Sequence, residues 1–142
     1  MNKIRVTVWN EFLHEKSQSA FGELIRSFYP DGIHGAIAKN IAADDLEIRL
    51  ASLDQPEHGW TDDVLAAADG LIWWGHCAHD RVADAVVDKV QKRILEGMGL
   101  IVLHSGHYSK IFRRMLGTSC SLRWREIGEK ERVWVVDQQH PI

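Results

Sequence analysis

The chain has 142 residues, of which 45% are hydrophobic and 26% are charged, and its formal net charge is −3. This size and composition predict a single globular domain and exclude a collagen-like, disulfide-rich or disordered chain. The acidic balance predicts no nucleic-acid partner, and the apolar runs are too short to predict a membrane span.

The first third of the chain alternates strand and helix patterns. A strand is predicted over residues 4–9, and a polar loop follows over 10–15. Apolar residues at helical spacing predict one helix over 21–28 and a second over 32–41. The run at 46–50 mixes polar and apolar residues, so we expect a strand near the edge of a sheet.

The same alternation continues through the middle of the chain. Thr61 caps a short predicted helix, and an apolar strand follows over 70–74. Asp80 is the predicted cap of a long helix that runs through Glu96, and a second apolar strand covers 100–103. Two fully apolar strands are typical of the buried part of a parallel sheet.

The segment after the last apolar strand carries the most informative motif. Residues 104–107 are polar and contain a glycine, and a helix is predicted over 109–116, as in a tight strand-to-helix turn. Class I glutamine amidotransferases place a cysteine nucleophile on such a turn, in a Gly-x-Cys-x-Gly-His pattern. Gly106 and His107 fit the end of that pattern, whereas His104 stands at the cysteine position. The resemblance therefore predicts the architecture without the glutaminase chemistry.

Strands that alternate with helices over short loops predict one three-layer α/β domain over residues 1–142. We expect a doubly wound, mainly parallel sheet of the flavodoxin-like or class I glutamine amidotransferase-like kind. One or two extended segments are also predicted over 119–136. Ligands bind such sheets beyond the carboxyl ends of the strands. The loops at 10–15, 75–80 and 104–109 should therefore share one crevice.

Histidine is unusually frequent, with eight in the chain, and its placement is more informative than its number. Neutral imidazoles bind zinc and related ions, and they also exchange protons near neutral pH. Six histidines fall at the predicted carboxyl edge of the sheet: His14, His34, His76, His79, His104 and His107. His58 and His140 lie in turns beside prolines, and we expect both on the surface.

The histidine positions predict a set of metal ligands. If a divalent ion binds, zinc being the first choice, we expect imidazoles from different loops to hold it, namely those of His34, His76 and His104. His79 and His107 would then orient these ligands through hydrogen bonds. The alternative is structural, because a strand-end histidine that pairs with a nearby carboxylate satisfies its hydrogen bonds without any ion.

Tryptophans flank the same predicted crevice. Trp9, Trp73 and Trp74 lie at the ends of two strands, and aromatic faces suit the apolar faces of a sugar. Core packing explains them equally well. Because side chains alternate along a strand, Trp73 and Trp74 should point to opposite faces of the sheet, and at most one should reach a given cavity.

Two other residues at this edge are candidate nucleophiles, Ser105 and Cys77. Ser105 lacks the Gly-x-Ser-x-Gly elbow of serine hydrolases. Cys77 would need a base, for which His76 and His79 are near in sequence. The two cysteines, Cys77 and Cys120, make no disulfide framework, and the N-terminus enters a strand at once. We therefore expect reduced thiols, no signal peptide and a cytoplasmic protein.

A specific set of tryptophan, histidine and glycine motifs extends along the whole chain. They lie at residues 8–15, 29–35, 53–59, 72–80, 97–107 and 117–125. In this combination the chain resembles the trehalose-utilisation (ThuA-like) family, which is related to the class I amidotransferase fold. Members of that family continue with further strands and another histidine-bearing segment, so we expect these residues to form the N-terminal part of a longer family domain.

The resemblance implies bacterial catabolism of trehalose and similar disaccharides, beside a sugar dehydrogenase that makes 3-keto sugars. We expect a carbohydrate-active enzyme (an isomerase, lyase or hydrolase) that removes a proton next to the keto group. His104 is the predicted base or ligand, His34 and His76 are its predicted partners, and Glu11 is the second acid or base. The predicted substrate-binding residues are Trp9, Asn10, His14, Trp74, His79, Ser105 and His107.

Because the cysteine nucleophile is missing, a second function is also possible for this scaffold. A non-catalytic sugar-binding or regulatory protein could use the same scaffold, and it would bind a sugar without converting it. A retained glutaminase is disfavoured by His104. The apolar helix faces would also suit a homo-oligomer, although packing within one chain accounts for them as well.

Overall fold

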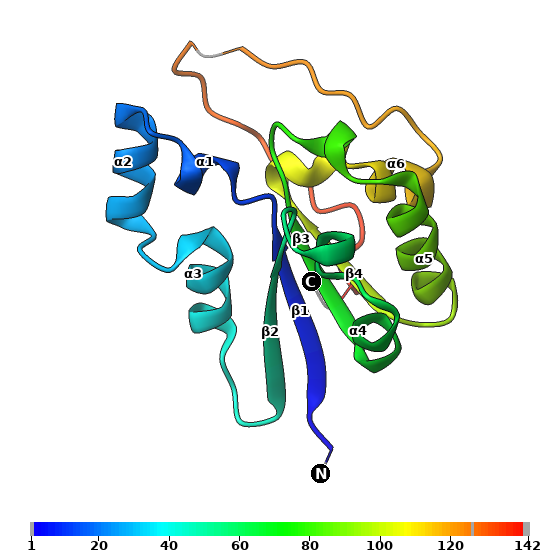
Figure 1. Ribbon diagram of the computed structural model, residues 1–142. Helices are drawn as coiled ribbons and strands as arrows, with labels where there is room; N and C mark the ends of the chain where they lie inside the picture. Colours follow the sequence, from blue (N-terminus) through cyan, green and yellow to red (C-terminus); the bar gives the residue numbers. More distant parts are fainter. Residues whose placement is uncertain (1, 126, 141–142) are drawn as a thin grey trace.

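The computed structural model describes residues 2–125 and 127–140 (Figure 1). The strands are β1 (Ile4–Asn10), β2 (Leu46–Ser52), β3 (Gly70–Trp74) and β4 (Gly99–Leu103). The α-helices are α1 (Leu13–Lys16), α2 (Ala20–Phe28), α3 (Gly32–Ile41), α4 (Asp62–Ala67), α5 (Asp84–Leu95) and α6 (Lys110–Leu116). The short 3₁₀ helices are η1 (Pro56–Gly59), η2 (His79–Arg81) and η3 (His104–Tyr108).

The four strands form one parallel sheet in the order β2-β1-β3-β4. The register aligns their carboxyl ends, because Asn10 pairs with both Ser52 and Trp74, and Trp74 pairs with Leu103. The predicted α/β class is confirmed, with a flavodoxin-like or amidotransferase-like topology. The prediction of an edge strand at β2 is also confirmed, since among the described strands β2 pairs only with β1.

Helices cover the two faces of the sheet unequally. Figure 1 shows α1, α2 and α3 on one side and α4, α5 and α6 on the other. The main core lies on the second side, where Trp9, Leu71 and Trp73 of the sheet pack with apolar residues of α4, α5 and α6. On the first side α3 contacts β1 and β2, while Ile101 of β4 stays half exposed.

The long helix predicted from Asp80 is interrupted. η2 ends at Arg81, and α5 begins only at Asp84, with Ala83 rather than Asp80 as its cap. The interruption serves packing, because Val82 is extended and 2% exposed, and its carbonyl accepts a hydrogen bond from Lys110 of α6. Buried apolar contacts here outweigh the gain from continuing the helix.

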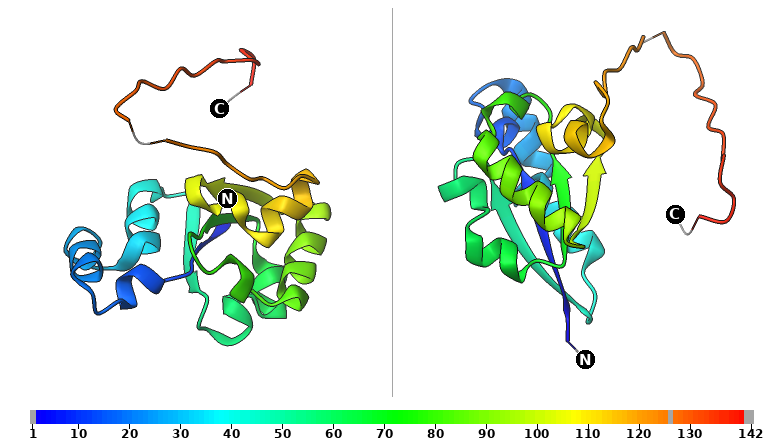
Figure 2. Two further views of the ribbon diagram at one scale, coloured as in Figure 1. Left: turned by 90° about the horizontal axis from the view of Figure 1, so that it is seen from above. Right: turned by 90° about the vertical axis from the view of Figure 1, so that its right-hand side faces the viewer.

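Three other predictions on local structure were incomplete or wrong. The polar loop predicted at 10–15 contains the short helix α1. Thr61 is the cap of α4, but its hydroxyl bonds the Asp63 side chain and accepts nothing from the helix backbone. Over 119–125 and 127–136 the described chain contains no strand, and it runs away from the sheet after α6 (Figure 2). None of the described helices is both long and apolar enough to cross a membrane.

The Arg5–Asp69 pair joins β1 to the start of β3 and gives a pH-dependent test of the fold. Asp69 accepts hydrogen bonds from the Arg5 backbone N–H and from its guanidinium at 2.9–3.1 Å. These bonds hold the pKa of Asp69 at about 2, below its ordinary 3.8. Because the pKa of Asp69 is lower in the folded than in the unfolded state, Asp69 stabilises the fold at pH values above its unfolded pKa. This stabilisation is lost as the pH falls through the folded pKa.

We therefore expect Asp69→Asn to lower the melting temperature at neutral pH, with the difference from wild type closing as the pH falls toward about 2. Thermal unfolding followed by circular dichroism across this pH range is the measurement. Asp44→Asn is the control, because no hydrogen bond or ion pair of the Asp44 side chain occurs in the described part of the chain. A constant difference at every pH would contradict this account of Asp69.

Candidate functional site

The turn after β4 is tight and strained, as its motif predicted. His104 has φ 29, a left-handed value that is rare for a residue with a side chain. Gly106 is needed for close packing, since a Cβ there would lie 2.7 Å from Val102 Cγ1 and 3.3 Å from the Trp73 carbonyl oxygen. Strain of this kind persists only where surrounding packing maintains it, and it is common at functional sites.

The loops after β1 and β3 are joined through one buried carboxylate. Glu11 is 1% exposed. Its two oxygens accept hydrogen bonds from the backbone N–H groups of Cys77 at 2.9 and 3.2 Å and of Ala78 at 2.9 Å. The Cys77 thiol donates to the same carboxylate over 3.2 Å. The buried charge therefore holds the β3 loop in place.

The electrostatics of this pair follow from its hydrogen bonds. Burial raises the pKa of Glu11, but hydrogen bonds from the backbone of Cys77, His76 and Ala78 outweigh it, and the net pKa is lowered. Burial, together with the adjacent Glu11 charge, raises the pKa of Cys77 to about 11. Glu11 is consequently ionised and Cys77 is a protonated thiol, which argues against Cys77 as a nucleophile at neutral pH.

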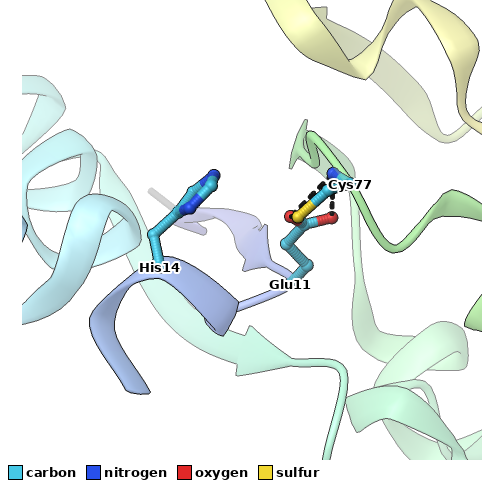
Figure 3. A group of neighbouring side chains, drawn as sticks. All are labelled: Glu11, His14 and Cys77. Carbon is cyan, nitrogen blue, oxygen red and sulfur yellow. Dashed lines mark hydrogen bonds between the residues drawn. The ribbon is translucent and has the colours of Figure 1, made fainter. Parts of the chain in front are cut away.

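Glu11, His14 and Cys77 form a group that could hold a metal ion. One donor atom from each residue lies within 4.8 Å of the other two (Figure 3). They come from the loop after β1, from α1 and from the loop after β3. Oxygen, nitrogen and sulfur donors of these types are ordinary zinc ligands.

A histidine pair lies beside this group. His14 Nε2 and His76 Nδ1 are 2.9 Å apart, so one ring donates a hydrogen bond to the other. The His14 ring also meets Trp74 edge-on, with centroids 5.7 Å apart, and Phe21 at 5.4 Å. At least one imidazole of the pair has to be neutral, and a neutral imidazole can accept a proton.

A second polar cluster surrounds the buried end of β1. The Asn10 side chain donates to Glu15 Oε1 at 2.8 Å, lies 3.4 Å from His34 Nδ1 and accepts from the backbone of Phe12. Glu15 Oε1 also accepts from Ile33 N–H, while its buried Oε2 has no hydrogen-bond partner within residues 2–125 and 127–140. Burial lowers the pKa of His34, which favours its neutral form.

The loop after β4 meets the loop after β3 through aromatic rings. Tyr108 lies 6.0 Å from the His79 ring and 6.1 Å from the His107 ring. His107 Nδ1 lies 2.6 Å from the Cys120 carbonyl oxygen, which fixes its orientation. Burial lowers the pKa of His79, and nearby Glu11 opposes that shift. The three loops predicted to share one edge of the sheet are therefore together.

The predicted site residues do not all occupy equivalent places. His104 is exposed, and neither its side chain nor that of Ser105 forms a hydrogen bond within the described residues. Trp9 is 1% exposed, stacks on Trp73 with ring centroids 4.0 Å apart and donates to the His58 carbonyl. Alternation turns the Trp9 ring into the core, which favours a packing role over the substrate contact predicted for it.

The predicted metal ligands also differ from the group observed. In the described part of the chain, donor atoms of His34, His76 and His104 do not form such a cluster, whereas those of Glu11, His14 and Cys77 do. His34 turns instead toward Asn10 and packs on Phe12. Residues at the same sheet edge can lie too far apart to share one ion, because a sheet edge is wider than one coordination sphere.

Sequence reasoning missed three roles. The sequence suggests Cys77 only as a nucleophile, although a thiol three residues beyond a strand can donate to a carboxylate from the neighbouring loop. No periodicity in the sequence distinguishes Glu15 from an acidic residue on the surface. His58 was expected on the surface, but its Nε2 accepts from Ala83 N–H while Nδ1 lies 2.6 Å from the Leu53 carbonyl.

Comparison with known families agrees with the resemblance found in the motifs. The family model ThuA, described as trehalose utilisation, matches residues 5–142. No curated protein matches the chain.

The close packing at Gly106 gives a direct test of the strand-to-helix turn. We expect Gly106→Ala to lower the free energy of unfolding by about 1–3 kcal/mol, as overpacking does in well-packed cores. Gly99→Ala is the control, because a Cβ there would lie 3.7 Å or more from its neighbours and Gly99 lacks a positive φ. Urea unfolding of both variants measures the difference, and equal stabilities would show that the turn is not tightly packed.

Proposed function

The chain belongs to the ThuA family, whose description suggests a role in trehalose utilisation, and we propose that it acts on a keto-disaccharide by histidine-assisted proton abstraction. The observation that carries the proposal is the meeting of ionisable residues from separate loops at the carboxyl edge of the sheet. Glu11 joins the β1 loop to the β3 loop, and His14 of α1 forms a hydrogen bond with His76 of the β3 loop. Parallel sheets bind their ligands at this edge.

The chemistry requires a base of moderate strength beside a keto group. A 3-keto group acidifies the neighbouring C–H bonds, so a neutral imidazole can take that proton and leave an enediolate. Return of the proton to the adjacent carbon gives isomerisation, and departure of the glycosidic oxygen gives elimination. His104 is our choice of base, because it is exposed at the strained turn, and His76 is its proposed partner.

Glu11 is better suited to stabilise positive charge than to transfer protons. Its lowered pKa makes it a weak base, and burial keeps it away from bulk water. This favours a role as metal ligand or counter-ion over the acid or base role expected from sequence. The half-buried side chains at this edge are the proposed contacts for sugar hydroxyls and ring faces, namely His14, Trp74, His79, Ser105 and His107. Asn10 is 0% exposed and its side chain bonds Glu15 and the Phe12 backbone, so we assign it to the support of its loop.

A divalent ion, with zinc as the first choice, fits the Glu11, His14 and Cys77 group. The supporting observation is the mixed oxygen, nitrogen and sulfur donor set within 4.8 Å. When bound, such an ion would stabilise the negative charge of an enediolate. Binding requires the thiol to lose the proton that it now donates to Glu11.

Turnover of 3-keto-trehalose tests the reaction. We expect His104→Ala to lower kcat by about 10²–10⁴-fold, the usual contribution of a general base. His140→Ala serves as the control, since it changes a histidine outside the three loops. Equal rates for wild type and His104→Ala would remove His104 from the mechanism. Calorimetric binding of the keto sugar without conversion, with zinc added, would instead favour a non-catalytic sugar-binding protein.

Cobalt substitution tests the metal site without reference to activity. We expect Co²⁺ to bind wild type with a near-ultraviolet thiolate-to-cobalt absorption band. Cys77→Ser should lose this band, and Glu11→Gln should weaken Co²⁺ binding. Cys120→Ser is the matched control, because the other cysteine lies in the segment after α6. A band that survives in Cys77→Ser and disappears in Cys120→Ser would contradict the proposed ligands.

A further inference from the structure

The side-chain amide of Asn10 has a fixed orientation at the carboxyl end of β1. Its Oδ1 accepts a hydrogen bond from Phe12 N–H at 2.9 Å, and its Nδ2 donates to Glu15 Oε1 at 2.8 Å. A backbone N–H can only donate, so the first bond identifies the amide oxygen and the second is consistent with the amide nitrogen. Asn10 is 0% exposed, and Glu15 Oε1 is itself held by Ile33 N–H. The amide therefore cannot turn over without losing both bonds.

The second hydrogen of Asn10 Nδ2 is directed to the ring of His34. The two nitrogens, Asn10 Nδ2 and His34 Nδ1, lie 3.4 Å apart. Because the amide nitrogen is a donor, His34 Nδ1 has to be the acceptor, and a ring nitrogen that accepts carries no proton. A ring turned over would place a C–H group against Asn10 and leave the donor without an acceptor. The ring is therefore neutral, with its proton on Nε2.

The His34 ring is held from other sides, but its Nε2 is not. The ring meets Phe12 edge-on, with centroids 5.1 Å apart. Gly32, with φ 75, lets the backbone approach the ring, because a Cβ there would lie 2.8 Å from His34 Nδ1 and Cε1. His34 is half-buried, and within residues 2–125 and 127–140 its Nε2 is neither hydrogen-bonded nor fully buried. The N–H of this ring is therefore available to a ligand.

We propose that His34 is a substrate-binding residue that offers Nε2–H as a neutral hydrogen-bond donor, and that Asn10 positions it by keeping the proton on Nε2. Asn10 is the last residue of β1, so the contact places His34 at the edge where parallel sheets bind their ligands. The acceptor that fits is an uncharged or partly charged oxygen, such as the keto oxygen of the sugar. This choice of acceptor rests on the proposed function, whereas the position of the proton rests on the hydrogen bonds alone.

A neutral donor suits the proposed reaction. When a base removes the proton beside the keto group, negative charge develops on the keto oxygen, and an N–H aimed at that oxygen stabilises the charge. Burial lowers the pKa of His34, which favours the neutral ring at pH 7. The same tautomer disfavours the metal-ligand role predicted for His34. A ligand nitrogen carries no proton, and the one nitrogen of this ring without a proton already faces Asn10.

NMR of the full chain with ¹⁵N-labelled histidine tests the position of the proton, since protonated and unprotonated ring nitrogens resonate far apart. At a pH of about 8, above the ordinary pKa of histidine, we expect His34 to carry its proton on Nε2. His58 is an internal control of the opposite kind. Its Nε2 accepts from Ala83 N–H and its Nδ1 lies 2.6 Å from the Leu53 carbonyl oxygen, so its proton should be on Nδ1.

Spectra of His34→Gln and His58→Gln assign the two sets of signals. A His34 ring that carries its proton on Nδ1, or that divides it between the two nitrogens, overturns the proposal.

Asn10→Asp tests the positioning role. A carboxylate oxygen replaces the N–H that faces His34, so His34 Nδ1 should gain a proton. Asn40→Asp is the matched control, because it adds the same charge at an exposed position of α3 and should leave the His34 signals unchanged. If circular dichroism shows that Asn10→Asp is unfolded, Asn10→Ser removes the N–H without adding charge, and His34 should then populate both tautomers. A folded variant whose His34 keeps its proton entirely on Nε2 overturns the role of Asn10.

Titration with 3-keto-trehalose tests the donor role. We expect the Nε2 signal of His34 to shift as the sugar is added and the signals of His58 to stay in place. A His34 Nε2 signal that does not move overturns the donor role. The same titration separates this proposal from the proposed reaction. A shift without turnover contradicts the reaction and supports the donor, whereas turnover without a shift supports the reaction and contradicts the donor.

Discussion

The buried charge of Glu11 is the constraint on which the candidate site depends. A carboxylate that is 1% exposed is tolerated only when hydrogen bonds replace its lost water. Those bonds come from the backbone of Cys77 and Ala78, so the loop after β3 has to fold around the end of β1. The same loop conformation places the start of η2 at His79. One charge thus fixes the backbone between two strands.

The parallel sheet supplies the frame in which this constraint acts. Strands in register bring their carboxyl ends to one edge, where the peptide groups of three loops need hydrogen-bond partners. Asn10 and Glu15 satisfy some of them inside the first loop, and His107 satisfies the Cys120 carbonyl beyond the last. Polar side chains gather at this edge for structural reasons as well as chemical ones. A histidine found there is therefore not by itself a ligand.

The sequence allowed the sheet and the loops at its carboxyl edge to be predicted, but not the pairing of side chains. Apolar runs such as 70–74 specify strands strongly, and alternation correctly separated Trp73 from Trp74. The break at Val82 was missed because helical spacing continues through it, while a contact from distant Lys110 decides the conformation. The metal group was missed for a similar reason. Its members come from residues 11, 14 and 77, and only the crossing of the two loops brings them together.

Metal binding and the protons of this site would be coupled. The Cys77 thiol carries a proton that Glu11 accepts, and His14 shares a hydrogen with His76. To hold an ion, Cys77 would have to lose the first proton, and His14 would have to offer a ring nitrogen that carries no proton. The metal group and the proposed partner of the base would therefore be linked, because His14 lies between Phe21, Trp74 and His76.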